Sequence, residues 1–150
     1  MKLPDVRTLV PHAEPMMLLD RLLSVDEDNF CAEVVIRKNS LFCSADGVGA
    51  WVGIEYMAQT IAAHAGYAAS LRGEPIKIGF LLGSRHYACH RDFFPIGSAL
   101  RIYVQCVLLG DNGLGSFECR IEDDSGEIAT ATITVFQPVN ASEFLEGLLE

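Results

Sequence analysis

Basic residues are scarce in this sequence, which has 11 Lys and Arg against 20 Asp and Glu and a net charge of −9 at pH 7. A chain this acidic is a poor partner for nucleic acid or an anionic membrane, because both are negatively charged themselves. The sequence also lacks an apolar run long enough to span a membrane and a basic-then-apolar signal at its N-terminus. These absences favour a cytoplasmic protein without a nucleic-acid partner or a membrane span.

Metal-binding and disulfide patterns are missing as well. The sequence contains neither a Cys-x-x-Cys pair nor a His-Glu-x-x-His segment, and its five cysteines are odd in number and widely spaced. Most of them lie in apolar, strand-like runs, which is typical of reduced, buried thiols. We therefore expect no metal site, no cofactor and no disulfide framework.

Residues 47–66 stand out among what is present. A glycine-rich start leads into a segment whose apolar residues recur at steps of three and four, which predicts a long helix. A helix that is apolar around most of its circumference has to be buried among other elements. Glu55 lies near its start and is either a structural carboxylate or a working acid/base group.

The remaining chain reads as strands around this helix. We expect strands at residues 16–25, 30–37, 76–90, 100–109, 114–122 and 127–137, and a short terminal helix at residues 140–149. Residues 110–113 and 123–126 have hairpin-turn chemistry. Residues 38–49 are left as a long loop, and loops of that length in compact domains are usually functional or mobile. The prediction is a single α+β domain over residues 1–150.

Three segments carry a resemblance to a known family. Residues 55–59, Glu-Tyr-Met-Ala-Gln, resemble the Glu-Ala-Met-Ala-Gln of the β-hydroxyacyl-ACP dehydratases (FabA/FabZ-like). Residues 11–21 resemble their Pro-His-Arg-x-Pro-x-Leu-Leu-Val-Asp-Arg opening, and residues 83–97 match a strand that ends in an aromatic-Pro-x-Gly turn. Residues 49–59 together with 81–85 are similar, more narrowly, to the thioester dehydratase-like proteins of aryl-polyene biosynthesis clusters.

The resemblance implies a hotdog fold, in which a curled antiparallel sheet wraps one long central helix. It also implies a dehydratase that removes water from a 3-hydroxyacyl chain on an acyl carrier protein and yields a trans-2-enoyl thioester. In the housekeeping enzymes the helix glutamate, here Glu55, works with a loop histidine from the other protomer. We therefore expect a homodimer or higher homo-oligomer, or a heterodimer with another hotdog protein.

The loop at residues 38–49 departs from the family because it contains no histidine. Three explanations remain open. A different second group acts with Glu55, for which His86, His90 and Asp46 are candidates. The chain is a weakened subunit that binds acyl chains or completes a heterodimer with an active partner. The chemistry is acyl-thioester hydrolysis, which in other hotdog proteins runs on a single carboxylate and a water.

Further residues have expected roles around Glu55. Gln59 lies one helical turn on and is placed to hydrogen-bond the Glu55 carboxylate as part of the substrate site. The backbone amides of Gly49 and Ala50 are candidates for holding the thioester oxygen. Phe42 and Trp51 are candidates for lining an acyl tunnel.

Other polar residues receive lesser roles. His64 is expected to face away from Glu55 and to be structural, and His12 to be structural or pocket-lining. Cys43 has no His/Asp order that would support a nucleophile. Docking of an acidic carrier protein to this acidic chain needs a local basic patch, for which Arg72, Lys77, Arg85, Arg91 and Arg101 are candidates.

Overall fold

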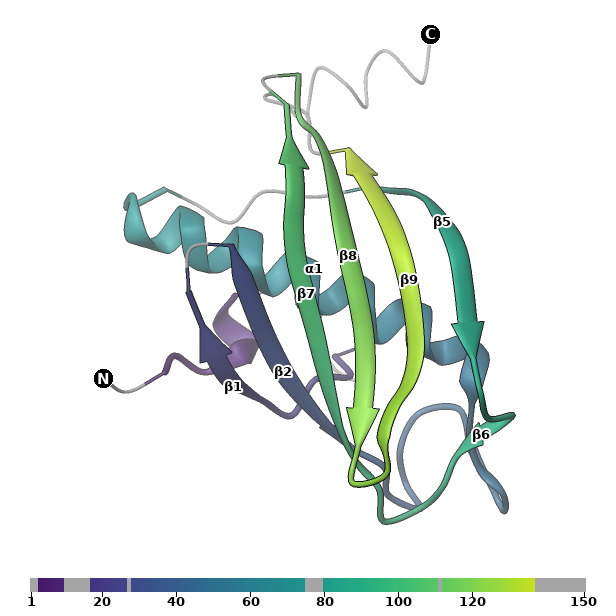
Figure 1. Cartoon of the computed structure of the whole chain (residues 1–150). Coiled ribbons are helices and arrows are strands. Elements are labelled where there is room, and N and C mark those ends of the chain that lie inside the picture. The colour runs from purple at the N-terminus through teal and green to yellow at the C-terminus, as the bar shows by residue number, and fades with distance from the viewer. Residues whose placement is uncertain (1–2, 10–16, 27, 75–79, 111, 137–150) are drawn as a thin grey trace, which may run out of the picture.

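The large antiparallel sheet and one long helix dominate the computed structural model, which describes residues 3–9, 17–26, 28–74, 80–110 and 112–136. The helix α1 (Gly53–Leu71) crosses one face of the sheet, beginning near its β5 edge and ending beyond β2 (Figure 1). The six strands lie in the order β1-β2-β7-β8-β9-β5. Their bounds are β1 Arg21–Val25, β2 Asn29–Val35, β5 Phe80–Cys89, β7 Ala99–Leu109, β8 Leu114–Asp123 and β9 Gly126–Phe136.

This arrangement is the predicted hotdog architecture. The meander β7-β8-β9 and the hairpin β1-β2 form as expected, and β5 closes the sheet by pairing with β9. In β2, Phe30, Ala32 and Val34 are buried as predicted for one face, but Cys31 on the opposite face is buried as well. The predicted C-terminal helix at residues 140–149 lies outside the described residues.

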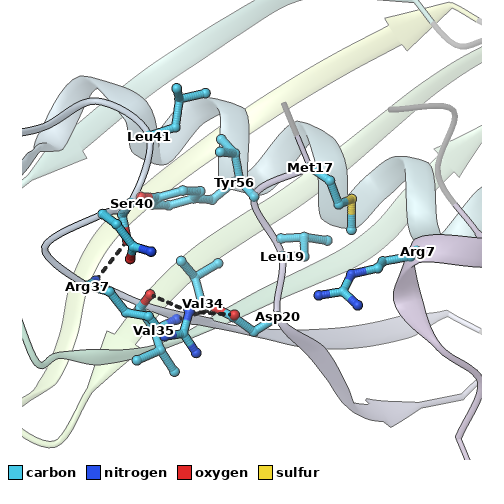
Figure 2. Close-up of a pocket in the computed structure, with 12 residues that line it drawn as sticks. Arg7, Met17, Leu19, Asp20, Val34, Val35, Arg37, Ser40, Leu41 and Tyr56 are labelled. Carbon is cyan, nitrogen blue, oxygen red and sulfur yellow. Dashed lines mark hydrogen bonds and ion pairs between the residues drawn. The ribbon is translucent and has the colours of Figure 1, made fainter. Parts of the chain in front are cut away.

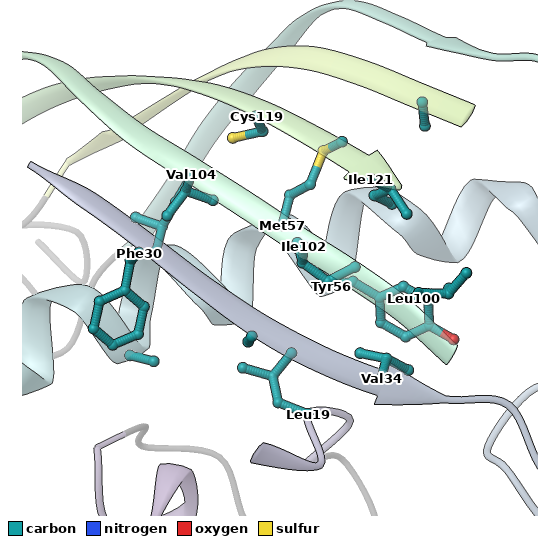
Figure 3. Packing of buried hydrophobic residues seen from close by; sticks show 14 of the residues in the cluster. Leu19, Phe30, Val34, Tyr56, Met57, Leu100, Ile102, Val104, Cys119 and Ile121 are labelled. Carbon is teal, nitrogen blue, oxygen red and sulfur yellow. The ribbon is translucent and has the colours of Figure 1, made fainter. Parts of the chain in front are cut away.

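Apolar side chains from α1 and from the inner face of the sheet form one core. Met57 and Tyr56 of the helix lie against Leu100 and Ile102 of β7 and Ile121 of β8 (Figure 3). Burial of each such side chain contributes on the order of 1.5–3 kcal/mol, so this helix face fixes the helix on the sheet. The helix comes especially close to the N-terminal segment at Gly66, where an added Cβ would collide with the Leu9 carbonyl oxygen.

The predicted loop at residues 38–49 contains regular structure, which corrects the expectation. Two short strands, β3 (Cys43–Ser44) and β4 (Gly47–Gly49), pair with β6 (Phe93–Phe94) in a second, three-stranded sheet. Gly47 has a φ of +115°, and an added Cβ there would collide with the Phe94 carbonyl oxygen. Strands this short show no period-two signal, so their pairing was not visible in the sequence.

The predicted strand at residues 16–25 begins only at Arg21. Asp20 still donates its N–H to the Glu33 carbonyl oxygen, but two residues earlier the Leu18 N–H binds a helix side chain instead of a neighbouring strand. Residues 17–20 therefore leave the sheet and run along α1. Within the described ranges, no helix is long and apolar enough to cross a membrane.

Candidate active site

Glu55 lies in the first turn of α1, directly after a short 3-10 helix (Ala50–Val52). Its side chain is half-buried, so it is partly shielded yet reachable from outside. The N-terminal end of a helix favours a negative charge, because the first backbone N–H groups carry partial positive charge. The fold thus places one carboxylate at the start of the helix, where it is partly shielded from solvent and can still take part in proton transfer.

Gln59 lies one turn further along α1 and is completely buried. Its Nε2 donates a hydrogen bond to Glu55 Oε1 at 3.0 Å, which confirms the predicted contact. The other polar atom of the Gln59 side chain, Oε1, accepts a hydrogen bond from the Leu18 N–H at 2.9 Å. The carboxamide therefore joins Glu55 to the main chain of the N-terminal segment, a connection that the sequence did not reveal.

A cavity of about 370 Å³ opens beside this region. The ring of Tyr56 and the side chains of Met17 and Leu19 form its apolar part, while Arg7 and Arg37 approach from opposite ends (Figure 2). Tyr56 follows Glu55 in α1, and the Leu18 segment lines the same cavity. The cavity thus adjoins the helical turn that carries Glu55, although neither Glu55 nor Gln59 lines it. Its volume lies at the lower end of the range of small-molecule sites.

Asp20 holds two sides of this cavity together. Its Oδ2 accepts the Val35 N–H at 2.6 Å, and its Oδ1 lies 2.8 Å from Arg37 Nη1. The Arg37 N–H in turn donates to Ser40 Oγ at 2.8 Å (Figure 2). These contacts fix residues 17–20 and the start of the segment after β2 relative to each other.

Tyr87 is a residue near the site that sequence reasoning missed. It comes from β5, and its phenol donates a hydrogen bond to the carbonyl oxygen of Ala50, just before α1. Burial raises the pKa of Tyr87, so the phenol stays protonated and keeps this donor. Its inward direction was not foreseeable because the β5–β9 register shifts between Arg85 and Ala88.

The same irregularity affects His86 and His90, two of the candidates for the second group that acts with Glu55. A regular strand would have placed both side chains on one face. His86 instead has a φ of +58° within the register shift, and His90 follows the end of β5. Both side chains are exposed.

Asp46 and the two amides before α1 have different surroundings. Asp46 is exposed in the turn between β3 and β4, and its N–H donates to Ser44 Oγ. The Ala50 N–H donates to the Asp92 carbonyl oxygen at 2.9 Å. Its role in holding the thioester oxygen stays a prediction. Gly49 lies in β4 opposite Phe93, and its role stays a prediction.

Phe42 and Trp51 contact each other, with ring centroids 5.3 Å apart. They are 46% and 65% exposed and do not line the cavity described above. Their predicted role in binding an acyl chain therefore stays a prediction, located on an exposed surface beside the start of α1.

His64 is half-buried and lies beside two aromatic residues of the core. Its ring makes edge contacts with Phe30 and Phe117, at centroid distances of 5.5 and 6.1 Å. This agrees with the structural role expected from its position on the helix. His12 lies outside the described residues.

Of the five free cysteines, Cys31 and Cys119 are buried, whereas Cys43, Cys89 and Cys106 are half-buried. Burial raises the pKa of Cys31 to about 11 and that of Cys119 to about 12, so both stay as unreactive thiols at neutral pH. Cys43 is half-buried, and its Sγ contacts the Ser44 carbonyl oxygen. In the part of the chain that the structure describes, no group of His, Cys, Asp and Glu is arranged to hold a metal ion.

The proposed basic patch does not form as one surface. Arg72 pairs with Glu74 at the end of α1, whereas Arg91 and Arg101 pair with Asp123 and Asp124 at the β8–β9 turn. These two places lie at opposite ends of the molecule (Figure 1). Lys77 and the Arg85 side chain are outside the described part.

Comparisons with known proteins agree with this architecture. The chain is 28% identical to a chain of the dehydratase heterocomplex ApeI:P from Xenorhabdus doucetiae, with a TM-score of 0.89 over 99% of this chain and 100% of that one. AziG of S. sahachiroi (14% identity, TM-score 0.64, 87% and 98% covered) shares the fold. So does smu.793 from Streptococcus mutans UA159, solved with acetyl CoA (16% identity, TM-score 0.59, 84% and 95% covered).

No curated protein sequence matches the chain. A protein-family model does match, and it extends over residues 4–146 under the description ApeP dehydratase. The resemblance to the hotdog dehydratases, drawn from residues 11–21, 55–59 and 83–97, is thereby confirmed. Since the match covers nearly the whole chain, this protein belongs to the ApeP-like family of dehydratases.

Proposed function

We propose that this chain supplies Glu55 as the acid/base carboxylate of a 3-hydroxyacyl thioester dehydratase. The substrate is carried by an acyl carrier protein in the cytoplasm, in a pathway of the aryl-polyene type. The observation that carries the proposal is the placement of Glu55, in the first turn of α1, hydrogen-bonded by a completely buried glutamine. Membership of the ApeP-like family supports the reaction class.

The reaction needs two proton transfers. A base removes the proton from C2 of the acyl chain, and the electron pair left behind forms the C2=C3 double bond as the C3–O bond breaks. Protonated Glu55 donates its proton to the departing hydroxyl, which leaves as water. The thioester oxygen gains negative charge during proton removal, and backbone N–H groups near the start of α1 stabilise it.

The base comes from a second hotdog subunit in this proposal. The segment before α1 has no histidine, and of the alternatives within the chain, His86, His90 and Asp46 are exposed. The similar chain from Xenorhabdus doucetiae belongs to a dehydratase heterocomplex. A partner that carries the loop histidine of the housekeeping enzymes would place it opposite Glu55 across a subunit interface.

The test is intact-mass analysis of a 3-hydroxyacyl-carrier protein. It is incubated with the wild-type chain or with Glu55→Gln, each alone and each combined with a hotdog dehydratase subunit that retains the loop histidine. We expect loss of one water from the acyl chain with the wild-type complex and no loss with the Glu55→Gln complex. Glu55→Gln keeps the size of the side chain and removes its ability to donate and accept the proton.

Two other outcomes would redirect the assignment. Appearance of free carrier-protein thiol, without loss of water, would indicate thioester hydrolysis. Full dehydration by the Glu55→Gln complex would show that the active carboxylate belongs to the partner and that this chain only completes the assembly. Dehydration by the wild-type chain alone would place the second group within this chain.

A further inference from the structure

We infer that Gln59 is a positioning residue, which takes its own orientation from the main chain at Leu18 and uses it to hold the Glu55 carboxylate in place. The inference rests on the proposed function of Glu55. It gives Gln59 a different role from the expected contact with substrate. It also makes residues 17–20, which lie far from α1 in sequence, part of the apparatus that prepares the acid/base group.

The orientation of the Gln59 carboxamide follows from its partners. A backbone N–H can only donate, so the atom that faces Leu18 at 2.9 Å has to be the oxygen. The amino group is thereby directed at Glu55, whose Oε1 accepts from Nε2 at 3.0 Å. A flipped amide would place its amino group against the Leu18 N–H, where two donors meet, and would place two acceptors together at Glu55.

The contact point on the main chain is itself held in place. Met17 and Leu19, on either side of Leu18, are buried in the core. Asp20 then fixes the segment by accepting the Val35 N–H at 2.6 Å and by pairing with Arg37 at 2.8 Å. Because Leu18 cannot shift without disturbing these contacts, Gln59 and through it Glu55 are tied to the sheet.

The effect on Glu55 is electrostatic as well as geometric. Gln59 is completely buried, and a hydrogen bond in such surroundings is stronger than in water. A donor held in this position limits the directions that the Glu55 carboxyl group can take. Removing the donor should therefore lower the rate of the chemical step.

Other groups that titrate or carry charge surround this end of α1, and all of them are common to the variants below. Burial raises the pKa of Tyr56 and of Tyr87, so both remain neutral in the assay range. Asp20 is paired with Arg37. Arg7, Asp20 and Arg37 line the cavity beside Tyr56. Asp20 and Cys43 act electrostatically on Tyr56, and Cys89 acts on Tyr87.

The experiment measures kcat and KM across pH for four variants of the active complex, with a 3-hydroxyacyl-carrier protein as substrate. Gln59→Leu removes both hydrogen bonds at nearly constant volume, and Gln59→Glu keeps the shape and the acceptor for Leu18. Thr60→Val is the matched control, because Thr60 is also completely buried in α1 and its hydroxyl only binds the Tyr56 carbonyl oxygen. Glu55→Gln reports on the proposed function itself.

We expect Gln59→Leu to lower kcat about tenfold to a hundredfold with little change in KM, because misplacing a reacting group affects the chemical step. In Gln59→Glu, a protonated side chain still donates to Glu55, whereas an ionised one repels it. The activity of Gln59→Glu relative to wild type should therefore fall steadily as pH rises. Thr60→Val should keep the wild-type kcat and pH profile, even if its melting temperature falls.

A purely structural role for Gln59 would lower the melting temperature and scale the activity equally at every pH. That result, or a raised KM with unchanged kcat, would overturn the inference. Wild-type activity in Glu55→Gln would instead overturn the proposed function. Loss of activity in Glu55→Gln, together with wild-type kinetics in both Gln59 variants, would leave the proposed function standing and remove only the positioning role.

Discussion

The phenol of Tyr87 in β5 donates a hydrogen bond to the carbonyl oxygen of Ala50, at the start of the 3-10 helix that leads into α1. An added Cβ at Gly53, the first residue of α1, would collide with the Tyr87 oxygen. The edge strand β5 and the start of α1 therefore pack directly against each other. The position of Glu55 depends on this contact because Glu55 lies in the same helical turn.

We expect Tyr87→Phe to destabilise the protein by about 1 kcal/mol, because the Ala50 carbonyl oxygen loses the phenol as a donor and keeps the Gly53 N–H. Urea denaturation of the two proteins measures this difference. Tyr67→Phe is the matched control, since it keeps the ring contact with Phe30 at 6.0 Å. Equal stability of Tyr87→Phe and wild type would show that the hydrogen bond contributes nothing.

Asp123 makes stability dependent on pH in the acid range. Burial alone would raise its pKa, but the Ser125 hydroxyl and N–H and the Arg91 guanidinium together lower the pKa below its ordinary value of 3.8. Because the folded state holds the proton less tightly than the unfolded state, this stabilisation is complete above the unfolded pKa. It is lost as pH falls through the lower, folded pKa.

We therefore expect Asp123→Asn to unfold at a lower temperature than wild type at pH 7 and to lose the difference as the pH falls well below 3.8. Thermal unfolding followed at several pH values measures this. Asp124→Asn is the control, because Asp124 is fully exposed and lies 3.8 Å from Arg101, so solvent screens this pair and it contributes little to stability. A constant difference between Asp123→Asn and wild type at all pH values would contradict the assignment.

Gly66 is the point at which α1 touches the N-terminal segment. Since an added Cβ would collide with the Leu9 carbonyl oxygen, which is main chain and cannot rotate away, we expect Gly66→Ala to destabilise the fold by about 1–3 kcal/mol. Gly83→Ala is the comparison, because nothing lies within 4 Å of a Cβ added there. Chemical denaturation should separate the two variants. A stabilised Gly66→Ala, as helix propensity alone would give, would show that the two segments are not in contact.

Trp51 is the single tryptophan of the chain and is 65% exposed against Phe42. If these two rings receive the acyl chain, as the sequence led us to predict, the substrate removes water from the indole. We expect tryptophan emission to shift to shorter wavelength when a long-chain acyl thioester is added, and to shift less in Phe42→Ala. An unchanged spectrum at saturating substrate would remove both residues from the acyl site.

Long, regular patterns of apolar residues in the sequence were sufficient to predict most of the fold. The helix was visible because apolar residues repeat through residues 54–65, and β2 because Phe30, Ala32 and Val34 alternate with other residues. Short pairings left no such signal. β3, β4 and β6 span two or three residues each. β3 pairs with β4 across a tight turn, but β6, which completes this sheet, is distant in sequence.

The candidate site was predictable where a single helix determines it. Glu55 and Gln59 are four residues apart on α1, so helical geometry alone indicated their contact. The roles of His86 and Tyr87 were not predictable, because the register shift in β5 reverses the regular alternation at that point. The hydrogen bond from Leu18 to Gln59 was also invisible, since a main-chain donor has no residue type that reveals it.

That main-chain donor has a consequence for tolerance to mutation. Every residue except proline has a backbone N–H, so position 18 can change its side chain without losing the hydrogen bond to Gln59. Substitutions at position 18 would leave the hydrogen bond to Gln59, and through it the contact with Glu55, intact. Only proline would remove this hydrogen bond. The requirement for a specific side chain falls on the helix side of this contact, at Gln59.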